Sequence, residues 1–215
     1  MLLVRSGDMS SNIKNGFSIT QGGYVQCRSS RYTCDTTIDN EEFHFSPGLN
    51  ILKGDIDESW AISYLLSMYS ERPKDFMLES EPEIVAKDKR ISLNDISGSI
   101  CYIDECYSLF KSKKQVKSLI ENGISSTGNK MTANEIVQIF SLEQLDRQVR
   151  YCGNEKWRSM CAIGCAYGKD VFCFPWISKK MGKYYQGHLK KVISELCKLQ
   201  KIIILPTNCD ESEFK

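Results

Sequence analysis

The chain has 215 residues, which is enough for one α/β domain with a hydrophobic core of its own. Lys plus Arg number 28 against 27 for Asp plus Glu, so no overall charge indicates nucleic acid or a cationic partner. The N-terminus, Met1 to Asn15, lacks the apolar core of a signal peptide. No apolar run approaches the ~20 residues of a spanning helix. We expect a cytoplasmic protein that does not insert into a membrane and reaches one only through a partner.

The ten cysteines do not have the spacing of a metal site or a disulfide framework. No Cys-x-x-Cys pair occurs, and His44 and His188 lie far from any cysteine pair in the sequence. Cys161, Cys165 and Cys173 stand inside apolar runs. We therefore expect small buried side chains with reduced thiols, and no metal.

The N-terminal quarter is predicted to form strands. Segments rich in Thr, Tyr, Phe, Val and Ile alternate with Gly and Asn over the first fifty residues. A short apolar strand, "LNILKG", then ends at Gly54. Residues Asp55 to Ser59 are predicted to cap a helix that continues through "SWAISYLLSMYS".

The middle of the chain reads as a connection followed by helices. Residues 71–98 contain Pro73, Pro82 and many charges, which predicts loops with at most one short strand. "GSICYID" is a candidate buried strand. The segments "KKQVKSLIEN" and "TANEIVQIFSLEQL" have apolar residues three and four apart, as amphipathic helices do.

The C-terminal third alternates helices with fully apolar strands. "EKWRSMCAIGCAYG" and "YYQGHLKKVISELCKLQ" are predicted helices, and "DVFCFPW" and "KIIILPTN" are predicted strands. This alternation is typical of a parallel sheet that is buried on both faces.

Five landmarks follow one another in this framework: "GDIDESWA" after the strand "GLNILK", "SICYIDECYSLF", "YCGNEKWR", "VFCFPW" and "KIIILPTN". Their order resembles an ABC ATPase, the nucleotide-binding domain of ATP-binding cassette transporters, from about Phe43 to Asn208. The resemblance implies a P-loop NTPase-like α/β fold with a parallel-sheet core, an N-terminal antiparallel β subdomain and a helical subdomain. Residues 1–215 would form one such domain. Residues 1–53 would be its β-rich part, 54–105 and 152–208 its core, and 106–151 its helical subdomain.

The place of the phosphate loop is degenerate. A working loop reads G-x-x-x-x-G-K-[ST], because its backbone N–H groups, lysine and hydroxyl hold the phosphates and Mg²⁺. Gly54 is retained, but Ser59, Trp60 and Ala61 replace the second glycine, the lysine and the hydroxyl residue. Three acidic residues lie between Gly54 and Ser59, where they would repel a polyphosphate.

The resemblance places three further landmarks at altered residues. Glu105 stands for a glutamine that contacts Mg²⁺ and water in the family. Pro175 and Trp176 stand for the Asp-Glu pair that orients the metal and polarises water. Thr207 stands for the histidine that holds the γ-phosphate.

The signature segment, usually L-S-G-G-E-x-x-R, is the least altered landmark. Cys152 replaces the serine and Asn154 the second glycine, whereas Gly153, Glu155 and Arg158 are retained. In the family this loop presents backbone N–H groups to the γ-phosphate bound by the opposite subunit. An equally weighted alternative is that "GNE" only caps the following helix.

These departures predict a pseudo-ATPase with no catalytic residues and no ATP or Mg²⁺ bound in the usual pose. Its expected partners are an intact ABC ATPase subunit, a membrane permease or both, and not nucleic acid. Two alternatives remain open. One is a stand-alone interaction scaffold on the same fold. The other is a divergent nucleotide or small-ligand binder in which Glu105 and nearby acids hold a metal.

Overall fold

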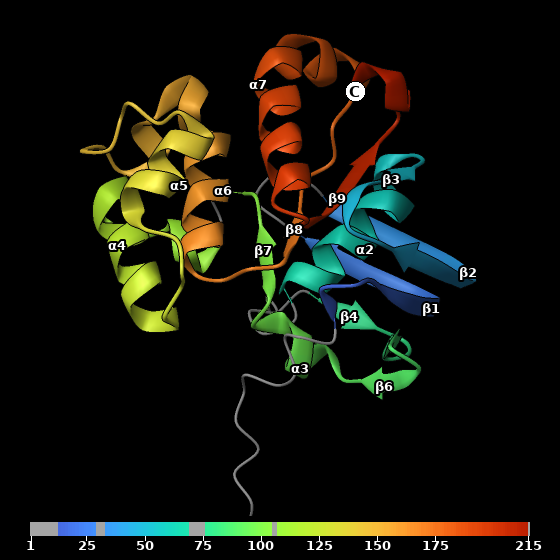
Figure 1. Ribbon diagram of the computed structural model, residues 1–215. Coiled ribbons are helices and arrows are strands. Elements are labelled where there is room, and N and C mark those ends of the chain that lie inside the picture. Colours follow the sequence, from blue (N-terminus) through green and yellow to red (C-terminus); the bar gives the residue numbers. More distant parts are fainter. Residues whose placement is uncertain (1–12, 29–32, 69–75, 105–106, 215) are drawn as a thin grey trace, which may run out of the picture.

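A computed structural model describes residues 13–28, 33–68, 76–104 and 107–214. Its strands form two sheets, one antiparallel and one parallel (Figure 1). The antiparallel sheet has the order β2-β1-β5-β6, with β4 also paired to β1. Its strands are β1 (Phe17–Arg28), β2 (Thr33–Phe45), β4 (Met77–Leu78), β5 (Glu83–Ala86) and β6 (Lys89–Ile91).

The parallel sheet has the order β3-β9-β8-β7. Its strands are β3 (Gly48–Lys53), β7 (Ile100–Tyr102), β8 (Val171–Cys173) and β9 (Ile202–Thr207). Every residue of β7, β8 and β9 is buried, as expected for parallel strands covered on both faces. The prediction of a buried parallel sheet is therefore confirmed.

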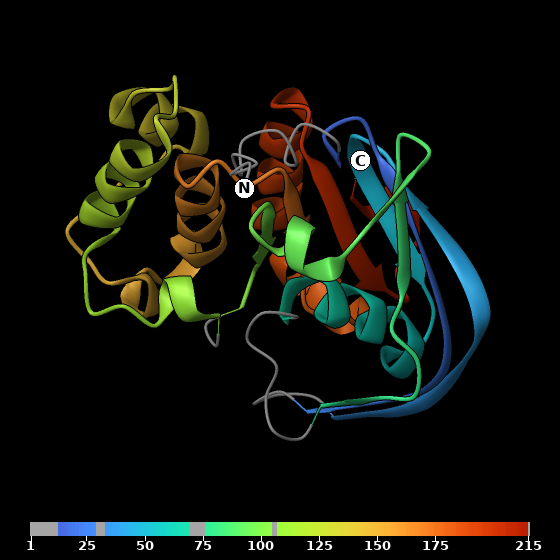
Figure 2. The same cartoon turned by 90° about the horizontal axis from the view of Figure 1, so that it is seen from below.

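Helices cover both faces of the parallel sheet. They are α2 (Ile56–Met68), α3 (Leu93–Ser97), α4 (Val116–Thr127), α5 (Ala133–Phe140), α6 (Lys156–Ala166) and α7 (Lys179–Lys198). Helix α2 contacts both β2 and β9, and the antiparallel strands β1 and β2 curve around it (Figure 2). Helices α4, α5 and α6 form a separate group beside the sheet (Figure 1).

Local signals explain the helical group. Thr132 and Glu135 form a capping box at the start of α5, and Gly128 ends α4 in the left-handed conformation, with φ of 64°. Helix α6 approaches the parallel sheet closely at Gly164, because a Cβ there would meet the Phe172 ring at 2.7 Å and the Cys101 sulfur at 2.9 Å. The two predicted helices between residues 109 and 145 are confirmed as α4 and α5.

The structure differs from the expected division of the chain in two places. Strand β3 pairs with β9 in the parallel sheet and not with the N-terminal strands. Residues 77–91 form three strands, although a loop-rich connection with at most one strand was expected. Strands β4 and β5 pair with β1, and β6 pairs with β5, which are tertiary contacts that short segments do not encode.

The cysteines lie mostly in the core. Nine of the ten are among the described residues, and none of these nine forms a disulfide; Cys106 lies outside them. Cys161, Cys165 and Cys173 are at most 1% exposed, so their predicted burial is confirmed. Burial raises the pKa of the Cys165 thiol to about 12, which makes it a poor nucleophile near neutral pH.

Candidate functional site

The carboxyl ends of β3, β9 and β8 meet at one edge of the parallel sheet, and three of the predicted landmarks follow these ends. The backbone N–H of Gly54 donates to the carbonyl of Thr207 at 3.2 Å. The Ser63 hydroxyl, on α2, donates to the carbonyl of Phe174 at 2.8 Å. The structure therefore brings together the phosphate-loop, Asp-Glu and histidine positions that the sequence suggested.

The segment at the phosphate-loop position is a regular helical turn. Helix α2 begins at Ile56, so of the residues Asp55 to Ser59 that were predicted to cap the helix only Asp55 precedes it, and the others form its first turn. The backbone N–H and the hydroxyl of Ser59 both donate to the Asp55 carbonyl, at 3.4 and 2.6 Å. A phosphate loop instead needs N–H groups that curl around the ligand. The Ser59 N–H is already bonded within the turn.

Trp60 and Ala61 belong to the hydrophobic core. The Trp60 side chain is fully buried, and its Nε1 donates to the Tyr102 hydroxyl at 3.1 Å. Its ring stacks on Tyr64 with the centroids 4.7 Å apart, and Tyr64 in turn meets Tyr102 edge-on at 5.6 Å. Ala61 is 1% exposed. The side chain in the lysine position is thus a packing element of α2.

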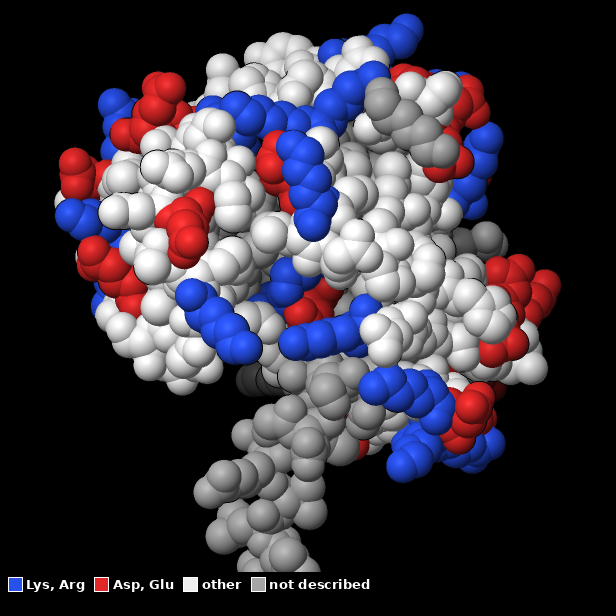
Figure 3. All heavy atoms as spheres, viewed as in Figure 1, with Lys and Arg blue, Asp and Glu red and all other residues white. Residues whose placement is uncertain are grey.

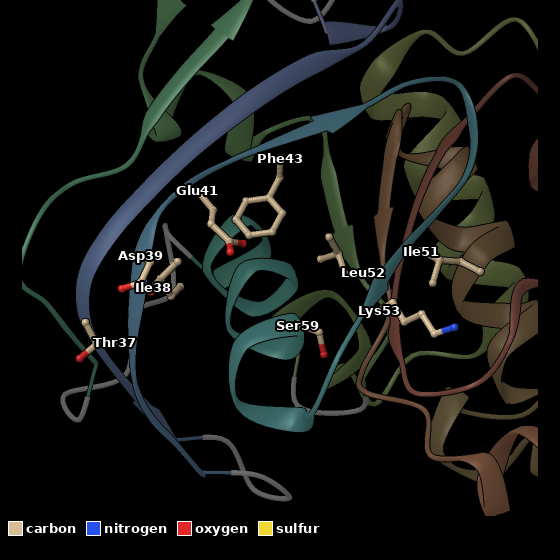
Figure 4. Close-up of a pocket in the computed structure, with 9 residues that line it drawn as sticks. All are labelled: Thr37, Ile38, Asp39, Glu41, Phe43, Ile51, Leu52, Lys53 and Ser59. Carbon is tan, nitrogen blue, oxygen red and sulfur yellow. The ribbon is translucent and has the colours of Figure 1, made fainter.

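A hollow of about 230 Å³ lies between β2 and the first turns of α2 (Figure 4). Glu41 and Phe43 of β2 form one side, and Ser59 and Leu52 lie across from them (Figure 4). Asp39 and Glu41 contribute carboxylates. Sequence reasoning did not identify this hollow.

Lys53 is the cation among the residues that line this hollow, and it is already paired. Its Nζ donates to Asp210 at 2.9 Å. This hydrogen bond raises the pKa of Lys53 and lowers that of Asp210. The carboxylates nearby, including Asp55 at the start of α2, make the region unfavourable for a polyphosphate.

The Asp-Glu and histidine positions carry structural side chains. Pro175 is buried and Trp176 half-buried after β8. The Thr207 hydroxyl donates to the Ile177 carbonyl at 2.5 Å and accepts from the Cys209 N–H at 3.0 Å. Thr207 therefore fastens two neighbouring loops together. It has no imidazole with which to hold a phosphate.

The segment after Trp176 is also helical. Helix α7 starts at Lys179, capped by the Ser178 hydroxyl, which accepts from the Met181 N–H at 3.2 Å. We expected this helix to begin near Tyr184, but it begins five residues earlier, at Lys179.

Glu105, the predicted counterpart of the family's glutamine, lies outside the described residues. The strand before it, β7, ends at Tyr102. Within the part of the chain that the structure describes, no group of three or more His, Cys, Asp or Glu side chains could hold a metal ion.

The signature-like segment remains exposed at the start of α6. Gly153 has φ of 51°, and no atom lies within 4 Å of the place where its Cβ would stand. Asn154 is exposed as well, and both belong to the short 3-10 turn Gly153–Glu155 that leads into α6. Cys152 is buried, and burial raises the pKa of its thiol.

Glu155 and Arg158 fasten this turn to the segment after α5. The buried Glu155 carboxylate accepts from the backbone N–H groups of Glu143 and Gln144, at 3.0 and 3.1 Å. Arg158 lies 3.7 Å from the same carboxylate and donates to the Ser141 carbonyl at 2.7 Å. The Glu155 side chain makes no capping hydrogen bond to α6, which argues against the alternative of a simple helix cap.

Comparison with known proteins identifies the fold. No family model and no curated protein sequence matches the chain. An ABC transporter ATP-binding protein from Pyrococcus furiosus superposes with a TM-score of 0.58 at 13% identity, covering 91% of this chain and 93% of that one. The protein cbiO1 from Clostridium perfringens, described as part of the ABC transporter complex cbiONQ, gives 0.55 at 14% identity, covering 91% and 79%.

A bacterial Atm1-family ABC exporter with ATP bound also superposes, with a TM-score of 0.55 at 13% identity. The match covers 93% of this chain and 36% of the exporter. These likenesses show that the chain has the fold of an ABC ATPase domain, with a parallel core sheet, an antiparallel sheet and a helical group. Among the described helices, none has the length and apolar character needed to cross a bilayer.

Proposed function

We propose that this chain, with its ABC ATPase fold, is a non-hydrolysing subunit that acts through a partner in a transport complex. The partner would be an intact ABC ATPase, a membrane permease or both. The observation that carries the proposal is the helical turn at the phosphate-loop position, with Trp60 packed in the core. No Mg·ATP would then be bound there in the usual pose.

The chemistry of hydrolysis supports this proposal. Phosphoryl transfer to water requires phosphate capture, a metal and a group that positions the water, all at once. At the edge of the sheet the chain instead has Trp60 in the core, Pro175 and Trp176 after β8, and Thr207 bonded to backbone. None of these side chains binds a phosphate or a metal as the family residues do.

The signature-like turn supports a role toward another subunit. Gly153 and Asn154 are exposed, and Glu155 holds the turn in place from beneath. Among the similar structures, cbiO1 is described as part of a transporter complex. By analogy, this chain would reach the membrane through its partner. The edge of its parallel sheet would then contact other proteins and would not bind nucleotide.

The first test is to purify the chain from its own cells, identify the bound subunits and measure their ATPase activity. Gly153→Asp places a carboxylate at the exposed turn, and we expect the partner's ATPase rate to fall by about tenfold or more. Gly128→Asp is the matched control, because Gly128 also has a positive φ, of 64°, and no atom within 4 Å of its Cβ position.

If Gly153→Asp leaves the partner's rate unchanged, the signature-like turn does not face a nucleotide site and the proposal fails. If neither an ABC ATPase nor a permease co-purifies, the stand-alone scaffold becomes the better account. Far-ultraviolet circular dichroism of both variants would show that each remains folded.

A further inference from the structure

Two cysteines stand directly opposite each other on the antiparallel strands β1 and β2. Cys27 is the Cα partner of Cys34, one residue pair before the described part of the ladder ends at Arg28 and Thr33. Directly opposed residues of an antiparallel pair have Cα atoms about 4.5–5.5 Å apart, and a disulfide needs about 4.4–6.8 Å. The strand pairing therefore already provides the backbone separation of a disulfide.

The two side chains share the buried face of the hairpin. Cys27 and Cys34 are both 0% exposed, whereas the next residue pair, Arg28 and Thr33, is exposed. A hydrogen bond with Cys34, and then burial, raises the pKa of the Cys27 thiol. A hydrogen bond between two thiols brings their sulfur atoms into contact. The pair therefore needs no rearrangement of other side chains before a bond can form between the sulfurs.

Among the described strands, no other cysteine pair is in register. Cys101 of β7 and Cys173 of β8 are offset by one residue pair. Because adjacent residues of a strand point to opposite faces, these two side chains lie on opposite sides of the parallel sheet. Cys161 and Cys165 belong to helix α6, where no ladder holds a partner opposite them. Strand register thus prepares a disulfide at Cys27 alone.

Cys34 also connects the hairpin to helix α2. Its thiol donates to the carbonyl of Asp57, in the first turn of α2, with the sulfur 3.2 Å from the oxygen. A disulfide has no S–H group, so a bond at Cys34 removes this donor while it fixes β1 to β2. The covalent state of the pair therefore changes the contact between the hairpin and the turn at the phosphate-loop position.

We propose that Cys27 and Cys34 are a disulfide-forming pair, oxidised by a small-molecule disulfide such as glutathione disulfide and reduced again by a dithiol. One thiolate of the pair attacks a sulfur of glutathione disulfide, which gives a mixed disulfide and one glutathione. The other thiolate then attacks the protein sulfur of the mixed disulfide and releases the second glutathione. The pair loses two electrons and two protons, and the two glutathione thiols take them up. This goes beyond the proposed function, since it concerns the covalent state of the chain alone.

Long-range charge does not select the thiols that such an oxidant reaches. Basic and acidic side chains are intermixed over the face shown in Figure 3, and the chain has 28 basic against 27 acidic residues. A charged oxidant is therefore drawn to no single region of the chain. Access depends on local opening, and the pair lies beside the exposed residues Arg28 and Thr33 near the end of the described ladder.

The test is peptide mapping by mass spectrometry after the purified full chain is incubated with glutathione disulfide. Trypsin cleaves after Arg28 and Arg31, so the disulfide would join peptides 15–28 and 32–53, at a mass two hydrogen atoms below their sum. We expect this linked product to be the main protein disulfide and to disappear with dithiothreitol. The oxidised chain should melt about 5 °C higher than the reduced chain, because the bond closes a short loop in the unfolded state.

Cys27→Ala and Cys34→Ala should each abolish the linked peptides and the rise in melting temperature. Cys165→Ala is the matched control, because it also removes a buried cysteine but should leave both effects in place. The proposal is overturned if the wild-type chain gives no linked product, or if other cysteines are joined in its place. It is also overturned if the linked product melts at a lower temperature, because the native strands would then not accommodate the bond. None of these outcomes depends on nucleotide or on the Gly153→Asp result with a partner.

Discussion

Replacing Ser59, Trp60 and Ala61 with glycine, lysine and serine is expected to lower the free energy of unfolding by about 4–6 kcal/mol. It is also expected to leave ATP unbound, although it restores the phosphate-loop sequence at these positions. Trp60 is fully buried and stacks on Tyr64, so a lysine there loses the packing and buries an ammonium group. Glycine at position 59 adds a smaller cost inside the helix and removes the hydroxyl bond to Asp55.

Urea unfolding measures this loss of stability. It is followed by far-ultraviolet circular dichroism, which reports on the backbone and not on the fluorescence of Trp60. Met77→Lys is the control, because Met77 is 57% exposed and its replacement should change stability by no more than about 0.5 kcal/mol. If the triple variant does not fold, Ser59→Gly alone still tests the turn, with an expected loss of about 1–2 kcal/mol. A triple variant that keeps its stability and binds Mg·ATP would show that the turn opens into a phosphate loop.

Glu155→Ala should lower the free energy of unfolding by about 3–5 kcal/mol, because it breaks a buried ion pair and leaves two backbone N–H groups without their acceptor. The Glu155 and Arg158 side chains are only 6% and 14% exposed, so water can replace little of this interaction. The variant should also loosen the exposed turn at Gly153.

Glu143→Ala is the matched control for this network. It removes an exposed carboxylate but keeps the backbone N–H that Glu155 binds, so stability should hardly change. A double-mutant cycle with Arg158→Ala measures the coupling between the two charged side chains. Equal stability of Glu155→Ala and the wild-type chain would mean that the turn is held by other contacts.

Local composition predicted the parallel sheet well. The strands β8 and β9 are continuous apolar runs, and such runs have few alternatives to a buried parallel sheet. The helices α4 and α5 were predicted from apolar residues three and four apart, whereas the caps at Thr132 and Gly128 became apparent in the structure. Apolar patterns of this kind determine the structure of the same residues that carry them, so they can be recognised in the sequence.

The start of α2 was predicted less well because the landmark order suggested a loop up to Ser59. Acidic residues stabilise the first turn of a helix, and "DIDES" supplies them, so the local signal favours an earlier start. Asp55 and Asp57 thus indicate that α2 starts near Ile56. That Trp60 and Ala61 are core residues is a property of the tertiary structure.

Two features of the site depend on distant contacts. The hollow beside α2 exists because the β1–β2 register shifts between Gln21 and Gly23, which changes the face that β2 presents after Ile38. Glu155 binds N–H groups of residues 143 and 144, and only its i, i+3 spacing from Arg158 was visible in the sequence. The shift falls at Gly22 and Gly23, and glycine inside a strand is a local signal of a bulge, whereas the loop contact of Glu155 has no local sequence signature.

The most direct test of the account is calorimetric titration of the purified chain with Mg·ATP, supported by a thermal-shift scan. The helical turn at Ile56 and the buried Trp60 predict no heat of binding and no change in melting temperature. Micromolar binding with a matching rise in melting temperature would contradict the account, because another set of residues would then hold the phosphates.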